Sequence, residues 1–165
     1  MRGSTLDEID KKLLDLLQAD GRMSQQDLAD AVGLSSPATG ERIRKLVQHG
    51  IIKSFSAVLD ADALGHGVTA FIFVSIDGSE YFPEFVEHSR ETPEILECHA
   101  ITGAGSHMLK IRTSSTSSLE RLLATIQSWP GVSSTTTSVV LSVAKESLKV
   151  PLDQLPDTET IPTSS

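Results

Sequence analysis

Apolar residues recur at helical spacing three times within the first 50 positions. Each series is preceded by a residue type that caps helix N-termini and followed by a glycine. These pairs are Thr5 and Gly21, Ser24 and Gly33, and Ser36 and Gly50. The spacing predicts helices over about 6–19, over two turns after Ser24, and over about 37–48, with Pro37 at the first helical position of the third.

The second and third predicted helices are joined by a tight glycine turn. On the third helix an apolar face would pack against the other two, and a basic face would point outward. The packing positions are Thr39, Ile43, Leu46 and Val47. This arrangement is typical of a helix-turn-helix, and the alternating stretch Ile52 to Leu59 predicts a strand after it, as in the winged type.

From Val68 the pattern changes to alternating strands and helices. The predicted order is strand 68–76, helix 81–89, strand 95–102, strand 107–113, helix 118–128 and strand 133–143. This βαββαβ order predicts a ferredoxin-like α+β fold, in which both helices lie on one face of an antiparallel sheet. Because Phe71 and Phe73 make the opposite face of the first strand apolar as well, we expect a second copy to cover it in an isologous homodimer.

The predicted elements divide the 165 residues into four parts. We expect a DNA-binding helix-turn-helix at 5–52, a linking strand and hinge at 53–67, a ferredoxin-like domain at 68–150 and a flexible tail at 151–165. Residues 1–4, MRGS, resemble an expression leader. The longest apolar runs are shorter than the roughly 20 residues of a membrane span, and the lone Cys98 fits a reducing compartment, so a cytoplasmic location is expected.

Charge is distributed unevenly along the chain. The formal net charge is -8, yet residues 1–60 carry 8 Lys and Arg against 9 Asp and Glu, so most of the acidity lies beyond them. Between Ser35 and Lys53, four basic residues face only Glu41. Since distant charges are screened over about 8 Å at physiological salt, the acidic total does not exclude DNA binding.

Seven residues around the third predicted helix are candidates for DNA contact. Basic side chains would meet phosphates or guanine edges, and serine hydroxyls with helix N-terminal amides would meet phosphate. The candidates are Ser35, Ser36, Thr39, Glu41, Arg42, Arg44 and Lys45. An ordinary helical subdomain with solvated basic residues remains an alternative, as does an assembly module with a vestigial helix-turn-helix.

Four stretches in this order and spacing resemble the Lrp/AsnC family of bacterial and archaeal regulators. They are LDEIDKKLLDLLQADGRMSQQDLADAVGLS, ERIRKLVQHGIIKSFSAVLD, LECHAITG followed by HMLK, and LLATIQSWPGV. The resemblance implies a DNA-binding transcriptional regulator whose C-terminal domain forms dimers, and often octamers, with a small amino acid bound in clefts between dimers.

The expected effector-binding residues lie in a glycine loop and in the last strand. They are Thr102, Gly103, Ala104, Gly105, Ser106, Thr135 and Thr137. A tight connection between strands is the alternative interpretation of the loop. The loop lacks the aspartates common in the family, which should weaken recognition of an ammonium group. Gly40 is a second departure, because the family places a larger residue there, and its small size would loosen the helix or permit close approach to DNA.

No catalytic set, zinc spacing or cofactor motif stands out, so we expect no enzyme activity, metal or cofactor. Some relatives of this fold resemble sirohaem decarboxylases, which leaves an enzyme as the main alternative class. Its porphyrin pocket would need His99, His107, Lys110 and Arg112 to converge, whereas these residues alternate along strands.

Overall fold

The computed structural model describes residues 6–152, which form two compact units. Residues 6–58 and 146–152 make up the first, here called the helical unit, and residues 59–145 make up the second, called the sheet unit. The sequence division placed 146–150 with the ferredoxin-like domain, whereas the contacts of the chain group these residues with the helices. The expected leader, residues 1–4, and most of the expected tail, residues 153–165, lie outside the described part.

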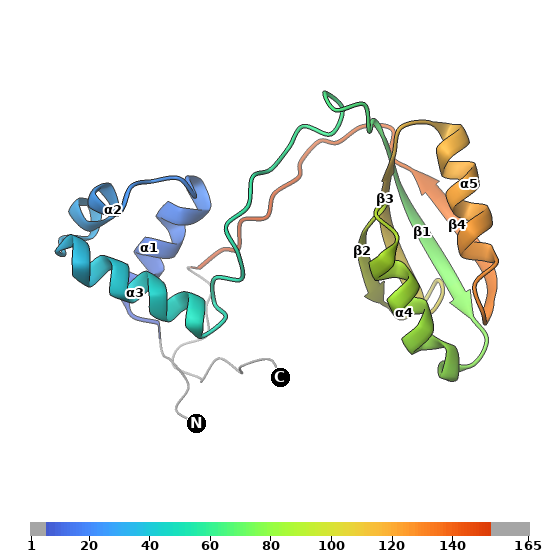
Figure 1. Ribbon diagram of the computed structural model, residues 1–165, viewed down its shortest axis with the longest axis horizontal. Coiled ribbons are helices and arrows are strands. Elements are labelled where there is room, and N and C mark those ends of the chain that lie inside the picture. Colours follow the sequence, from blue (N-terminus) through green and yellow to red (C-terminus); the bar gives the residue numbers. More distant parts are fainter. Residues whose placement is uncertain (1–5, 153–165) are drawn as a thin grey trace. The chain divides into compact units, whose positions relative to one another are not determined.

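The helical unit contains three helices in the predicted order (Figure 1). They are α1 (Glu8–Ala19), α2 (Gln25–Val32) and α3 (Ser36–Gln48). Leu13, Leu28, Ala29 and Leu46 are almost fully buried where the helices meet. The glycine in the turn between α2 and α3, Gly33, adopts the left-handed conformation that ends α2.

Two helix caps in the helical unit differ from the sequence prediction. The cap of α1 is Asp7 rather than Thr5: its carboxylate accepts from the backbone N–H of Asp10 at 2.8 Å, and Asp10 accepts from the N–H of Asp7 at 3.3 Å. The cap of α3 is Ser35 rather than Ser36, because Ser35 has the extended backbone (φ −73°, ψ 151°) from which a side chain can reach back to the first turn.

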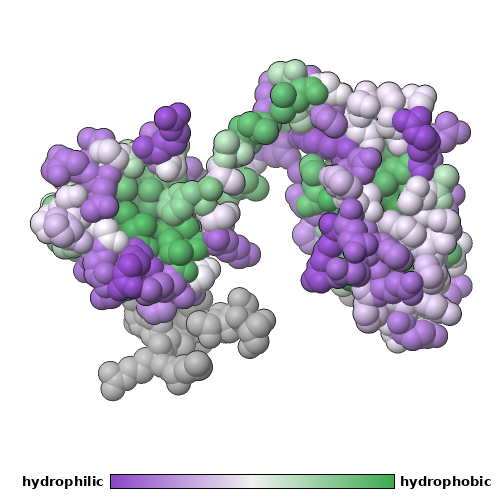
Figure 2. Space-filling view, viewed as in Figure 1, coloured by the Kyte–Doolittle hydropathy of each residue, from purple (hydrophilic) through white to green (hydrophobic). Residues whose placement is uncertain are grey.

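The predicted strand over Ile52 to Leu59 is wrong for this chain. Residues 53–67 contain no strand, and a hydrogen-bonded turn occupies 60–66. Alternating side chains favour an extended backbone, but a strand also needs a partner to complete its hydrogen-bond ladder. The segment instead carries exposed apolar side chains at Phe55, Val58, Leu59 and Leu64, and hydrophobic surface follows the link between the units in Figure 2.

The sheet unit confirms the predicted βαββαβ order. Its elements are β1 (Val68–Ile76), the short 3-10 helix η1 (Ser79–Tyr81), α4 (Phe82–Glu91), β2 (Ile95–Ala100), β3 (His107–Thr113), α5 (Thr116–Gln127) and β4 (Val132–Val139). The four strands pair antiparallel in the order β2-β3-β1-β4. The last strand ends at Val139, four residues before the predicted end, and its pairing with β1 ends at Ala70.

One face of the sheet is covered by α4 and α5, as Figure 1 shows. Alternate residues of β1 point into this core, so Ala70, Ile72 and Val74 are completely buried, while Phe71 and Phe73 on the other face are half-buried. The uncovered face is therefore partly apolar, as the sequence pattern indicated. Within residues 6–152, no helix has both the length and the apolar character required to cross a bilayer.

Candidate nucleic-acid interface and effector region

The exposed side of α3 displays a cluster of three charged residues. Arg44 donates from Nε to Glu41 Oε2 at 2.9 Å and from Nη2 to Glu41 Oε1 at 2.6 Å, which is a two-point ion pair. The ammonium of Lys45 lies 3.8 Å from the same carboxylate. The hydrogen bonds from Arg44 lower the pKa of Glu41, so this residue is charged at neutral pH. About half of each side chain is exposed, and the cluster can therefore meet a large partner.

Arg42, a predicted DNA contact, points to α1 instead. Its Nη1 donates to Asp7 Oδ2 at 2.7 Å and to Asp10 Oδ1 at 2.8 Å. Hydrogen bonds from Asp10 and then Asp7 raise the pKa of the guanidinium. Arg42 thus ties α3 to the N-terminal turn of α1 and contributes to the packing of the helices rather than to their outer face.

Thr39, also a predicted DNA contact, is buried inside the helical unit. Its exposed fraction is 0%, and its hydroxyl has no hydrogen-bond partner within the described chain. The same helical periodicity that put Thr39 on the packing face explains the outcome, since a residue on that side of α3 faces α1 and α2. Thr39 belongs to the core of the helical unit.

The two serines at the start of α3 make hydrogen bonds within the helical unit. Ser35 caps the helix through the backbone N–H of Ala38, at 3.4 Å. Ser36 accepts from the amide of Gln25, which donates to the Ser36 carbonyl at 2.6 Å and to its hydroxyl at 3.1 Å. Sequence reasoning missed Gln25, because an exposed glutamine at the start of α2 carries no local signal for a contact eleven residues away.

Gly40 is explained by this contact between helices. A Cβ atom at position 40 would lie 2.7 Å from Nε2 of Gln25 and 3.0 Å from its Cδ and Oε1. The small residue therefore leaves room for the Gln25 amide beside α3, where the sequence interpretation had invoked a looser helix or closeness to DNA.

The predicted effector loop closes tightly on β1. Ser106 donates to the carbonyl of Val74 from both its backbone N–H, at 2.9 Å, and its hydroxyl, at 3.2 Å. At Gly105, which has φ +127°, a Cβ atom would lie 2.7 Å from the same carbonyl oxygen. Thr102, Gly103 and Ala104 form the exposed tip. Ser106 and Gly105 thus fix the loop to the sheet. This agrees with the alternative interpretation of the loop, a tight connection between strands.

The two predicted effector segments flank the same residue of β1. Val74 pairs with His107, next to the loop, on one side and with Thr135 of β4 on the other. Adjacent strands are about 4.8 Å apart, so the loop and Thr135 lie roughly two strand spacings from each other at one level of the sheet. Thr137, two residues farther along β4, pairs with Ile72.

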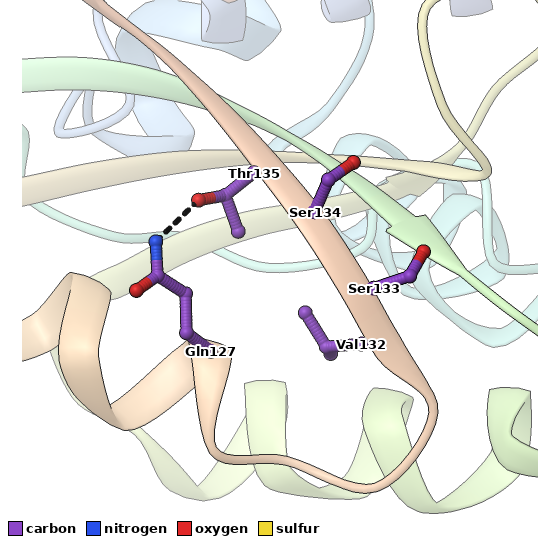
Figure 3. A pocket seen from close by; sticks show the side chains of 5 residues that line it. All are labelled: Gln127, Val132, Ser133, Ser134 and Thr135. Carbon is purple, nitrogen blue, oxygen red and sulfur yellow. Dashed lines mark hydrogen bonds between the residues drawn. The ribbon is translucent and has the colours of Figure 1, made fainter.

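Thr135 lines a polar pocket of about 230 Å³ between the end of α5 and β4 (Figure 3). Its hydroxyl accepts from Nε2 of Gln127 at 2.8 Å, as the dashed line in Figure 3 marks. The other lining residues are Val132, Ser133 and Ser134. Sequence reasoning missed Gln127, which lies eight residues before Thr135 and reaches it only because α5 turns back into β4.

The four residues that a sirohaem-decarboxylase-like site would need do not share one face of the sheet. His107 is buried among Phe82 and Phe85 on the helix-covered face, and this burial lowers its pKa. Lys110 belongs to the opposite face by strand alternation, where it lies 3.5 Å from Glu97. His99 also pairs with Glu97, at 3.0 Å, and Arg112 alternates with the same set as Lys110. The enzyme alternative is therefore not favoured.

Two family models match the chain in succession. Residues 6–53 match a winged helix-turn-helix DNA-binding domain, and residues 69–150 match the Lrp/AsnC ligand binding domain. The chain is 40% identical over 147 residues to the HTH-type transcriptional regulator FL11 of Pyrococcus horikoshii, covering 89% of this chain and 97% of that protein. It is 34% identical to the leucine-responsive regulatory protein of Escherichia coli, covering 88% and 90%.

A solved structure of a transcriptional regulator from Neisseria meningitidis in complex with L-Met superposes with a TM-score of 0.86 at 32% identity, covering 90% of this chain and 98% of that one. With the fold and the exposed charged helix, these matches define a DNA-binding transcriptional regulator with a second, ligand-binding domain. The chain belongs to the Lrp/AsnC family.

Proposed function

We propose that the chain regulates transcription by binding double-stranded DNA through the exposed face of α3, with Arg44 and Lys45 as the principal contacts. The observation that carries this proposal is that both cations project outward from α3, beside the exposed Glu41, while Arg42 is held by α1. A helix that is exposed on one side and packed on the other can enter the major groove. Ser35 lies at the N-terminus of α3, where phosphate would also meet helix amides.

Salt titration tests this assignment. Each lost phosphate contact reduces the slope of log affinity against log salt by about 0.9. Arg44→Gln and Lys45→Gln should each show such a loss, whereas Arg42→Gln should leave the slope unchanged and lower the stability of the helical unit. Binding that does not depend on salt, or equal slopes in all three variants, would refute the assignment.

We also propose a small amino acid as effector of the sheet unit. The regulator from Neisseria meningitidis was solved with L-Met, and the pocket at Thr135 offers hydroxyl and amide groups of the kind that bind polar ligands. The loop Thr102–Ser106 has no carboxylate, so a ligand ammonium would need other acceptors. Calorimetry with the twenty amino acids tests this, and Gln127→Ala should weaken any binding that occurs there; flat titrations throughout would reject it.

We further propose that the uncovered sheet face forms a homodimer, and that dimers assemble to octamers. Half-buried Phe71 and Phe73 support the dimer, because an apolar patch on a sheet face favours a partner. We place the protein in the cytoplasm and assign it no catalytic activity, since its relatives are named transcriptional regulators. Sedimentation velocity of Phe73→Asp against the unmodified chain tests the dimer: an unchanged mass would contradict it.

A further inference from the structure

We propose that Glu41 determines the DNA specificity of α3 by holding Arg44 away from unmatched DNA. This inference rests on the proposed DNA-binding function of α3. It concerns Glu41, the acidic residue of the cluster that Glu41 forms with Arg44 and Lys45. Glu41 is paired with Arg44 before any DNA arrives, and its charge opposes that of the two cations beside it.

The geometry makes Glu41 a restraint on Arg44. Both carboxylate oxygens of Glu41 accept from the guanidinium, from Nη2 at 2.6 Å and from Nε at 2.9 Å, so the Nε–Nη2 edge that could make a two-point contact with a phosphate or a guanine is already occupied. The same pair raises the pKa of Arg44 and lowers that of Glu41. To present this edge to DNA, Arg44 must therefore exchange Glu41 for a phosphate or a base.

Exposure makes this exchange possible. The side chains of Arg44 and Glu41 are 55% and 47% exposed, and exposed ion pairs add little to stability. A well-placed DNA acceptor can therefore take Arg44 from Glu41. A poorly placed acceptor, as on unmatched DNA, gains too little to do so, and the contact is not made.

The released carboxylate supplies the second part of the discrimination. A carboxylate in the major groove can accept from the amino group of cytosine, which is how acidic side chains contact bases. Opposite a base edge that presents only acceptors, or beside phosphate oxygens, the same carboxylate is repelled. The penalty falls on DNA that lacks an amino group at that position, so Glu41 lowers affinity for unmatched DNA more than for matched DNA.

Glu41→Gln tests the inference, because it removes the charge and preserves the shape of the side chain. Glu87→Gln is the matched control: Glu87 pairs with Arg90 at 3.2 Å, also three residues apart on a helix, but on α4 of the sheet unit. Both substitutions make the chain less acidic by one charge. The probes are a duplex that the unmodified full chain selects from a randomised library and the unselected library itself.

We expect Glu41→Gln to bind the unselected library about tenfold more tightly and with a salt slope steeper by about 0.9, because Arg44 then reaches a phosphate. Adding Arg44→Gln should abolish the steeper salt slope and most of the gain in affinity. A new selection with Glu41→Gln should yield sites relaxed or altered at one base pair. Glu87→Gln should match the unmodified chain.

The outcomes separate this inference from the function on which it rests. If the unmodified chain selects no duplex and its binding ignores salt, DNA binding by α3 fails, and the inference fails with it. If the chain discriminates between the probes but Glu41→Gln discriminates equally well, the inference alone is overturned. Equal effects of Glu41→Gln and Glu87→Gln would also overturn it, since they would reflect only the total charge.

Discussion

Gln18 of α1 and Val150, 132 residues later, exchange two hydrogen bonds. The amide nitrogen of Gln18 donates to the carbonyl of Val150 at 3.1 Å, and the backbone N–H of Val150 donates to Oε1 of Gln18 at 2.7 Å. Lys149 adds an ion pair with Asp15 on the same helix, at 3.5 Å. The chain therefore returns from the sheet unit to α1, and the helical unit includes a segment that follows the sheet in sequence.

Gln18→Ala should loosen this returning segment. Two exposed hydrogen bonds are lost, which predicts a loss of about 1 kcal/mol in local stability and about fivefold faster hydrogen exchange in α1. Exchange followed by mass spectrometry, peptide by peptide, measures this directly. Gln26→Ala serves as control, since its bond to Asp30 is local to α2 and contributes only about 0.2–0.5 kcal/mol.

Truncation after Ser147 completes that test. It removes Val150 and Lys149 together, so it should reproduce or exceed the effect of Gln18→Ala, and Gln18→Ala should then have no further effect. Additive effects of the two changes would mean that Gln18 stabilises α1 by some other contact.

The pair Asp7 and Arg42 predicts a pH dependence of stability. Burial raises the pKa of Asp7, but the backbone N–H of Asp10 and the Arg42 guanidinium together lower it below its usual 3.8. A carboxylate whose pKa is lower in the folded chain stabilises it above the unfolded value, and this contribution is lost as pH falls through the folded pKa. The stabilisation is therefore complete at neutral pH, and it is lost in acid as the pH falls through the lowered pKa of Asp7.

Asp7→Asn isolates this contribution, because asparagine can still cap α1. The variant should be about 0.5–1 kcal/mol less stable at pH 7, a modest value since half of the Asp7 side chain is exposed, and should approach the unmodified chain in acid. Urea denaturation between pH 2.5 and 7 measures the difference. In an Arg42→Gln background the pH-dependent part should vanish; its persistence would point to another partner.

The helices and strands followed from periodicity, because apolar side chains spaced for a helix or a strand must be buried on one side. Thr39 shows how the site departs from that rule. Its position was correctly assigned to the packing face, yet its polarity made it a candidate for DNA contact as well. Burial decides between the two, and a polar residue type by itself does not report burial.

Partners distant in sequence explain the other departures. Arg42 was predicted to contact DNA because a basic residue on α3 can bind a phosphate. Its actual partners, Asp7 and Asp10, precede it by 35 and 32 residues, and no spacing rule connects them to α3. Likewise, the strand predicted at Ile52 to Leu59 had the alternation of a strand and has no ladder partner among residues 6–152. Single-sequence patterns describe an element's faces and leave its neighbours undetermined.

Thr39→Val should stabilise the helical unit. The buried hydroxyl has no partner within the described residues, and replacing it with a methyl group of similar shape removes that penalty, for a gain of about 1 kcal/mol. Thermal denaturation measures the gain. Thr39→Ser, which keeps the hydroxyl and loses the methyl, should instead destabilise. DNA affinity should be the same for Thr39→Val as for the unmodified chain, and a specific loss would restore Thr39 as a DNA contact.

Gly105→Ala should cost more stability than Gly103→Ala, although both glycines have positive φ. At Gly103 (φ +104°) no atom of the described residues lies within 4 Å of an added Cβ, so alanine costs only the strained backbone conformation, about 1–2 kcal/mol. At Gly105 the added Cβ also meets the Val74 carbonyl oxygen at 2.7 Å, and the three nearest atoms all belong to the Val74 backbone, so no flexible side chain can move aside, for a further ~1–3 kcal/mol.

Thermal denaturation of the two variants ranks these costs, and the ranking bears on the effector. A larger loss at Gly105 would mean that this glycine is required for the close approach of the loop to β1. Ligand binding would then not be needed to explain why position 105 is a glycine. Equal losses would mean that the loop can leave Val74 at little cost. The hydrogen bonds of Ser106 to Val74 would then be exchangeable, and a ligand that binds at the loop could replace them.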